Sequence, residues 1–223
     1  MNKTRIEWCD YTWNPIVGCS PVSEGCANCY AAAISRRFKM AWGSAHFMRE
    51  RLGQPSKVRK PSRVFVCSMA DLGHETVRHE WRDDIYAAML AAPWHTYIVL
   101  TKRPGDWLAR LPANTWAGVT VENQRAAEMR IPVLLGITTT NKWFVSVEPM
   151  LEPISLAIAA YTGSESVSRL GGLKWVIAGP ETGPKARPCN PAWIEEVAHE
   201  CEVAGIPFFD KRKTGWIRRE WPT

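Results

Sequence analysis

Residues 96–103, TYIVLTKR, form a short apolar and β-branched run that ends in two basic side chains. Similar runs recur along the chain, and each ends in polar or charged residues: 64–71 (VFVCSMAD), 115–123 (TWAGVTVEN), 143–150 (WFVSVEPM), 175–183 (WVIAGPETG) and 207–211 (PFFDK). Most of their starts are about thirty residues apart, the length of a strand, a helix and two short loops. Continuous apolar strands favour a parallel sheet that is covered on both faces.

Helical patterns lie between some of these runs. Residues 76–92 form one, and residues 191–204 form another, with Asn190 placed as its N-cap and Gly205 placed to end it. Residues 105–111 leave room for only a stubby helix. Residues 157–172, rich in Ser and Gly, predict an irregular loop.

The succession of runs predicts the fold class. With a first strand near residues 15–18, the count is about seven strands, each followed by a helix or a loop. We expect an α/β fold in a single domain, an incomplete or distorted (β/α) barrel of the TIM-barrel type. The alternative is an open doubly wound sheet.

In either architecture, catalytic groups gather at the carboxyl ends of the strands. Polar residues at such an end can simply mark where the chain regains solvent. Several charged ends in succession instead predict a site. The residues at these ends are Asp71, Lys102, Arg103, Glu122, Asn123, Glu148, Glu181 and Lys211.

The composition favours one globular core in a soluble protein. The chain has 223 residues, of which 46% are hydrophobic, enough to bury one good core. No apolar run approaches the roughly 18 residues that a membrane span needs, and the first residues do not resemble a signal peptide. We therefore expect a cytoplasmic protein with no membrane partner.

Basic charge is concentrated in two segments. The net charge is +6, but residues 34–63 alone carry +8 and residues 211–223 carry +4. The basic parts of these segments, residues 36–63 and 211–219, suit DNA or RNA, because neutralising phosphates releases counterions. The alternative is a solvated helix face followed by a frayed tail.

Three of the seven cysteines are close together in the sequence. Cys19, Cys26 and Cys29 follow an apparent strand in a C-x6-C-x2-C arrangement, just before a helix that begins near Tyr30. In a reducing compartment this pattern indicates metal ligation and not a disulfide. Three thiolates suit a [4Fe–4S] cluster with one open iron, whereas structural zinc needs a fourth ligand. Zinc stays open as an alternative, with Cys9, Cys67 or His74 as that ligand.

Aromatic and polar side chains precede the cysteine loop. Trp8, Tyr11 and Trp13 alternate with Asp10 and Asn14 in the stretch EWCDYTWN. The aromatic rings could shield a cluster or stack on a base, or they could form a hydrophobic plug with the polar residues bonded to turns. The sequence favours the plug for the tryptophans and leaves the polar residues open.

The ordered motifs resemble a known family over nearly the whole chain. They are IEWCDYTWNPIVGCSPVSEGCANCYA, SMADL, LTKRP, GVTVEN, SVEPM, AGPETG and the closing FFDK. Together they resemble the phage-associated three-cysteine-motif proteins, which in turn resemble distant radical S-adenosylmethionine enzymes. The usual spacing in those enzymes is C-x3-C-x2-C with a Gly-Gly-Glu segment; here the first gap is six residues and the segment is absent.

The resemblance implies a cluster-binding loop at about residues 8–30 and S-adenosylmethionine as a cofactor. Charge and strand position suggest how such a cofactor would be bound: Lys102 or Arg103 would neutralise the methionine carboxylate, and Glu122 or Glu148 would accept from the ribose hydroxyls. Asn123 is a further candidate for cofactor binding. Asp71 or Glu181 would hold an amine. The candidate catalytic residues are Asp71, Lys102, Glu148 and Glu181.

Three functions follow from these patterns. The first is a radical enzyme that acts on a nucleic acid or a nucleotide-like substrate and takes electrons from a donor. The second is a nucleic-acid-binding module in which a cluster or zinc ion stabilises the fold. The third is a redox- or light-active repair protein. Cleavage of S-adenosylmethionine by the reduced protein would separate the first from the others.

Overall fold

The computed structural model describes residues 1–139, 141–160, 170–215 and 217–222. The chain, expected to form a single domain, is divided into two compact units. The first contains Met1–Val22, Cys29–Ala117 and Thr139–Asn141, and the second contains Ser23–Asn28, Gly118–Thr138 and Lys142–Thr223. The cysteine loop therefore contributes residues to both units.

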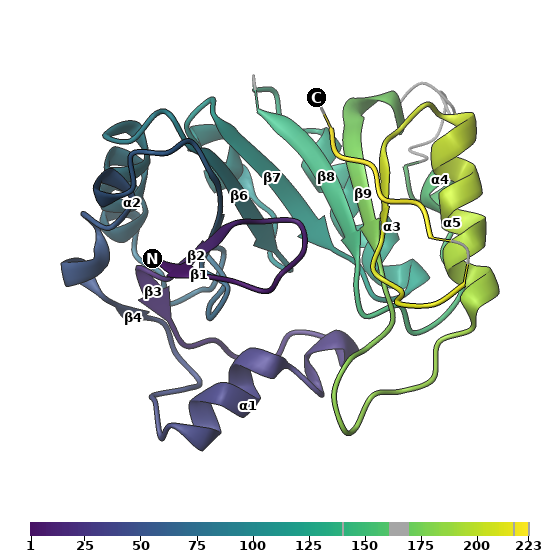
Figure 1. Ribbon diagram of the computed structural model, residues 1–223, viewed down its shortest axis with the longest axis horizontal. Helices are drawn as coiled ribbons and strands as arrows, with labels where there is room; N and C mark the ends of the chain where they lie inside the picture. Colours follow the sequence, from purple (N-terminus) through teal and green to yellow (C-terminus); the bar gives the residue numbers. More distant parts are fainter. Residues whose placement is uncertain (140, 161–169, 216, 223) are drawn as a thin grey trace. The chain divides into compact units, whose positions relative to one another are not determined.

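The strands form a mostly parallel sheet of eight, in the order β1-β2-β5-β6-β7-β8-β9-β10 (Figure 1). In the first unit, β2 pairs in parallel with β5 and β5 with β6, and β1 is antiparallel to β2. In the second unit, β8, β9 and β10 are parallel. The bounds are β1 Asn2–Lys3, β2 Tyr11–Trp13, β5 Arg63–Val66, β6 Thr96–Thr101, β7 Thr115–Thr120, β8 Lys142–Val147, β9 Leu173–Ala178 and β10 Phe208–Asp210.

The six apolar runs are all strands, so the α/β class and the parallel sheet are confirmed. The strand order follows the chain without a reversal, whereas a doubly wound sheet has one. The doubly wound alternative is therefore wrong. Among the described residues no pairing between β1 and β10 closes a barrel, so the barrel stays a prediction.

The strand predicted near residues 15–18 is not the first strand of this sheet. β3, Ile16–Val17, pairs antiparallel with β4, His46–Phe47, in a separate two-stranded sheet. The main sheet instead uses β2, directly before Asn14 and Pro15. Pro15 has no N–H to donate, and the Asn14 side chain accepts a hydrogen bond from the Met69 N–H, so the chain leaves the sheet here.

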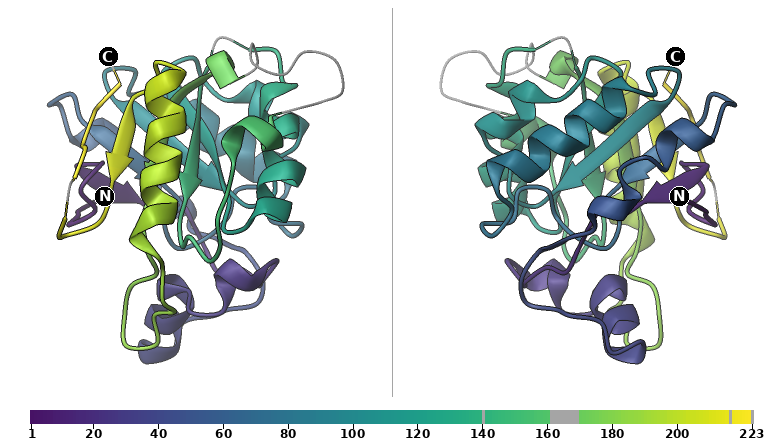
Figure 2. Two further views of the ribbon diagram at one scale, coloured as in Figure 1. Left: turned by 90° about the vertical axis from the view of Figure 1, so that its right-hand side faces the viewer. Right: turned by 90° about the vertical axis from the view of Figure 1, so that its left-hand side faces the viewer.

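The predicted helices are present with small shifts at their ends. α1 is Tyr30–Arg37, α2 is His79–Leu90, and a 3₁₀ turn, η4, covers Asp106–Arg110. In the second unit, α5, Pro191–Val203, runs beside β9 and β10 (Figure 2). Asn190 caps it by accepting from the Ala192 N–H at 3.1 Å, and Gly205 follows it with φ of +65°.

Two further helices and several short turns complete the described structure. α3, Gln124–Leu135, was not predicted, and α4, Leu156–Ala159, lies inside the segment expected to be irregular. Residues 161–169 of that segment lie outside the described residues. The remaining 3₁₀ turns are η1 Glu24–Cys26, η2 Arg49–Arg51, η3 Pro55–Lys57 and η5 Leu170–Gly172.

The tryptophans before the cysteine loop belong to the core of the first unit. Trp8 packs against Phe65 with ring centroids 4.8 Å apart, and the fully buried Trp13 donates its indole N–H to the Arg51 carbonyl at 2.8 Å. Asp10 accepts from the Arg63 backbone N–H at 2.7 Å. These contacts fit the interpretation of the tryptophans as a hydrophobic plug. Asp10 and Asn14 accept backbone hydrogen bonds near strand ends.

Candidate functional site

The three thiols of the cysteine loop are half-buried, and none forms a disulfide. Cys19 follows β3 in the first unit, and Cys29 is the N-cap residue of α1, where its carbonyl accepts from the Ala33 N–H. The positive end of a helix stabilises a thiolate. Cys26 ends the η1 turn in the second unit, with Ser23 Oγ 4.0 Å from its sulfur.

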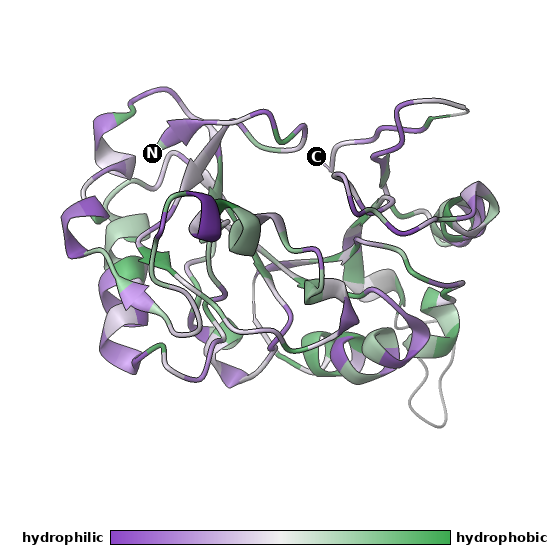
Figure 3. Ribbon diagram, turned by 90° about the horizontal axis from the view of Figure 1, so that it is seen from below, coloured by the Kyte–Doolittle hydropathy of each residue, from purple (hydrophilic) through white to green (hydrophobic). Residues whose placement is uncertain are grey.

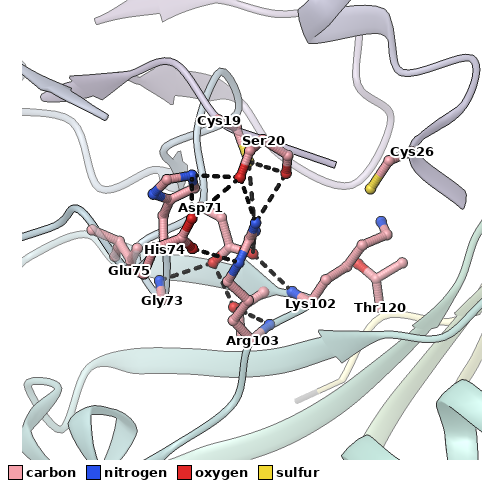
Figure 4. Close-up of polar contacts among 12 residues, drawn as sticks. Cys19, Ser20, Cys26, Asp71, Gly73, His74, Glu75, Lys102, Arg103 and Thr120 are labelled. Atoms are coloured by element: carbon pink, nitrogen blue, oxygen red, sulfur yellow. Dashed lines mark hydrogen bonds and ion pairs between the residues drawn. The ribbon is translucent and has the colours of Figure 1, made fainter. Parts of the chain in front are cut away.

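An arginine from the end of β6 lies against Cys19 (Figure 4). Arg103 Nη1 is 3.6 Å from Cys19 Sγ, and its Nη2 donates to the Ser20 carbonyl at 2.9 Å. Two carboxylates hold the same guanidinium, Asp71 and Glu75, each with one N–O distance of 3.5 Å. Arg103 thus joins the start of the cysteine loop to the strand ends of the first unit.

Asp71 is the centre of this arrangement. It is almost fully buried and accepts hydrogen bonds from the Thr101 hydroxyl, from the Lys102 N–H at 3.0 Å and from the Gly73 N–H at 2.8 Å. A Cβ atom at Gly73 would lie 2.3 Å from the Arg103 carbonyl oxygen, so only glycine allows this close approach. The carboxylate therefore fixes the backbone at Lys102, directly before the arginine, and at Gly73.

His74 extends this hydrogen-bond network through a contact with Ser20 of the cysteine loop. Its Nε2 lies 2.8 Å from the Ser20 hydroxyl, and its Nδ1 accepts from the Thr76 N–H at 3.2 Å. Burial and the nearby Arg103 charge lower the pKa of His74. Neutral His74 with Nδ1 as an acceptor must carry its proton on Nε2, and it then donates to Ser20.

The electrostatics of the network favour a permanent cation beside Cys19. Burial opposes the charge on Arg103, but Asp71 and the Cys19 sulfur outweigh it and raise the pKa of Arg103. Charge-assisted hydrogen bonds of this type are about twice as strong as neutral ones. Lys102 is half-buried, and Figure 4 shows its side chain pointing away from the Arg103 guanidinium, so the two predicted carboxylate-binding residues have different roles.

A second arginine holds the part of the loop that belongs to the second unit. Arg187 donates to both carboxylate oxygens of Glu181, at 2.6 and 2.9 Å, and to the Glu24 carbonyl at 3.1 Å. Asn28 donates to Glu181 at 3.0 Å and to the Lys185 carbonyl at 2.9 Å. The hydrogen bonds from Arg187 lower the pKa of Glu181 to about 2. We call this group the Glu181 clamp.

The other predicted site residues of the second unit have protein partners. Glu122 is fully buried and accepts from Arg130 at 2.8 and 3.4 Å. Glu148 forms an ion pair with Lys211. Asn123 accepts from the Ala126 N–H at 2.8 Å as the N-cap of α3. These groups would have to exchange a partner in order to hold a ribose.

The three residues considered as a fourth zinc ligand, Cys9, Cys67 and His74, are buried in the structure. Cys67 is buried after the end of β5, and burial raises the pKa of its thiol to about 12. Cys9 is also buried, and both ring nitrogens of His74 have partners.

The three thiols of the loop supply a donor set that either an iron–sulfur cluster or zinc could use. Three sulfur donors fit either metal, but a closed zinc site needs four ligands. Within the described parts of the chain, no group of three or more His, Cys, Asp or Glu side chains is already gathered around a metal position.

Both basic segments contain charges that are paired within the protein; in residues 36–63, Arg49 pairs with Asp84 and Arg63 pairs with Asp10. In the tail, Arg212 pairs with Asp210 and Glu195, Arg218 pairs with Glu220, and Trp221 packs 4.9 Å from the Phe209 ring. In the other segment the basic side chains of α1 and its end are exposed. These are Arg36, Arg37 and Lys39.

Sequence reasoning missed several members of the site. Ser20, Glu75, Asn28 and Arg187 had not been singled out, although their contacts define the surroundings of the loop. Asn28 and Glu181 are 153 positions apart, too far for a local pattern, whereas Arg187 is only six positions from Glu181 but lies in an irregular segment. Only the position of Ser20, beside a candidate ligand, offered a signal.

The fold and the site define a mixed α/β protein with charged strand ends and a three-thiol loop. A family model described as "Protein of unknown function (DUF5131)" matches residues 3–222, so the chain belongs to this family. No curated protein and no solved structure shows a significant match. In the described residues, no helix is long and apolar enough to cross a membrane.

Proposed function

We propose that this chain is an iron–sulfur protein whose cluster is held by Cys19, Cys26 and Cys29. The observation that carries the proposal is the positive environment of two of these thiols. Cys19 lies against the Arg103 guanidinium, and Cys29 lies at the N-terminus of α1. Both features place positive potential beside a sulfur that would be anionic as an iron ligand.

We further propose that the protein is an S-adenosylmethionine enzyme that acts on a nucleic acid or a nucleotide-like substrate. A reduced cluster would supply the electron for that chemistry. Lys102 is the better candidate for the cofactor carboxylate, because Arg103 is already held by Asp71 and Glu75. An electron donor would be a required partner.

The proposal is tested by anaerobic purification with iron and sulfide analysis. We expect about four irons and four sulfides per chain, as a [4Fe–4S] centre requires. Cys19→Ala, Cys26→Ala and Cys29→Ala should each lose the iron, whereas Cys201→Ala, a change in the buried face of α5, should retain it. Stoichiometric zinc without sulfide would contradict the proposal.

The cofactor part has its own measurement. S-adenosylmethionine should change the electron spin resonance signal of the reduced protein, and Lys102→Glu should weaken that effect without loss of iron. An unchanged signal at saturating cofactor would leave an iron–sulfur protein without this chemistry. The second candidate function, a nucleic-acid-binding protein stabilised by its metal, would then gain support from the exposed basic residues of α1.

A further inference from the structure

Arg103 is placed differently from an ordinary surface arginine. Its side chain is 15% exposed, and its Nη1 lies 3.6 Å from the Cys19 sulfur. A buried guanidinium needs partners for its charge and for its five N–H groups. Here one of those partners is a candidate metal ligand.

The carboxylates around Arg103 keep it in this position. Asp71 and Glu75 form ion pairs with the guanidinium. Ser20 accepts hydrogen bonds from it through its carbonyl oxygen at 2.9 Å and its hydroxyl oxygen at 3.1 Å. The Arg103 backbone N–H also donates to the Thr101 hydroxyl at 2.8 Å. With backbone and side chain both held, the N–H groups that face Cys19 have little freedom to turn away.

We propose that Arg103 is a positioning residue for the metal centre: it orients Cys19 and neutralises part of the charge that its sulfur carries. The role of Arg103 rests on the proposed cluster, whereas its contact with the Cys19 sulfur is present in the protein without a cluster. Hydrogen bonds to ligand sulfurs and nearby positive charge stabilise the reduced, more negative state of a cluster. Arg103 therefore raises the reduction potential of the centre.

The first test measures the thiol without any metal. In a Cys26→Ser/Cys29→Ser background, Cys19 is alkylated with iodoacetamide and its modification is followed by mass spectrometry. Arg103→Met should lower the rate about threefold below the pH at which the thiol ionises. Loss of a charged hydrogen bond lowers the thiolate fraction by about tenfold. A thiolate whose thiol has a higher pKa is intrinsically more nucleophilic, which offsets part of that loss in rate.

The second test measures the loaded protein. In the variant with all three cysteines, Arg103→Met should shift the reduction potential to a lower value while iron and sulfide content are retained at least in part. Arg103→Lys keeps the charge but not the planar fork, so it should restore part of the alkylation rate and part of the potential. This variant keeps the test valid if the Met variant is poorly folded.

The matched control is Arg110→Met, which removes an exposed arginine paired with Asp83 in the same unit. It should leave both readouts unchanged. Unchanged alkylation and an unchanged potential in folded Arg103 variants would overturn the inference. A wild-type protein that takes up no iron or sulfide would overturn the proposed function instead, while a slower alkylation in Arg103→Met would still support the contact with Cys19.

Discussion

At the scale of single residues, two parts of the cysteine loop are each held by an arginine. Arg103 holds Cys19 in the first unit, and Arg187 holds the backbone of Glu24 in the second. Each arginine is in turn fixed by carboxylates at strand ends. The acids predicted as catalytic groups, Asp71 and Glu181, therefore act first as anchors for these cations.

The Glu181 clamp predicts a dependence of stability on pH. The pKa of Glu181 is lowered from 4.5 to about 2, mainly by hydrogen bonds from Arg187. The folded state therefore keeps this carboxylate charged where the unfolded state becomes protonated. The stabilisation is complete above the unfolded pKa and is lost as the pH falls from about 4.5 towards 2.

Glu181→Gln should remove this contribution, about 1 kcal/mol after allowance for the partly exposed Arg187. Urea unfolding of the variant and the wild type at pH 7 and pH 3 measures it, and the difference between them should shrink at the lower pH. Glu195→Gln, which removes an exposed partner of Arg212, is the control. A difference that grows on acidification would show that the sign of the linkage is wrong.

At the scale of elements, helix caps explain residues that the sequence suggested for cofactor binding. Asn123 accepts from the Ala126 N–H and begins α3, as Asn190 accepts from the Ala192 N–H and begins α5. In Figure 3 the helices carry both hydrophobic and hydrophilic residues along their length. In α1 the buried residues are Ala31 and Ser35, and the basic Arg36 and Arg37 lie in the last turn.

Asn123→Ala tests the two roles against each other. As a cap it should lower the free energy of unfolding by about 1 kcal/mol, because an N–H at the start of the helix loses its acceptor. The effect of S-adenosylmethionine on the reduced protein should then be unchanged. Asn190→Ala, at a cap with no proposed ligand role, provides the comparison in the same denaturation experiment. Loss of cofactor binding without loss of stability would restore the ligand role of Asn123.

The sequence predicted the strands well because each is a continuous apolar run with a polar end, as in TYIVLTKR. It misplaced the first strand because Ile16 and Val17 have the same apolar character as Trp13, and only pairing with His46 and Phe47 separates them. The cysteines could be found from spacing. The contacts of Asp71 with Thr101 and of Glu181 with Asn28 could not, since they join residues 30 and 153 positions apart in the sequence.

At the scale of the whole molecule, some basic side chains form ion pairs within the protein and others are exposed. The tail arginines Arg212 and Arg218 are paired within the second unit, so the exposed basic surface of α1 is the stronger candidate for a polyanion. The net charge of +6 is compatible with such a partner. Affinity for nucleic acid would then depend mainly on residues that follow the cysteine loop.

Replacing Arg36, Arg37 and Lys39 by Gln should weaken binding to DNA or RNA and flatten its salt dependence. For every duplex phosphate that the variant no longer neutralises, the log–log slope should become shallower by about 0.9. Fluorescence anisotropy over a range of salt concentrations measures this. A second triple variant with the same charge change at the exposed Arg110, Arg125 and Lys185 is the control. Equal slopes for the wild type and both variants would contradict a role for α1.

The C-terminal segment has a consequence for solubility. β10 is an end strand of the sheet, and the chain returns along it: the Asp210 N–H donates to the Arg218 carbonyl, and the Glu220 N–H donates to the Phe208 carbonyl, both at 2.8 Å. An uncovered edge strand is a template for strands of other molecules. The returning segment occupies that template with Arg218, Arg219 and Glu220, so part of the predicted nucleic-acid tail also covers the edge of β10.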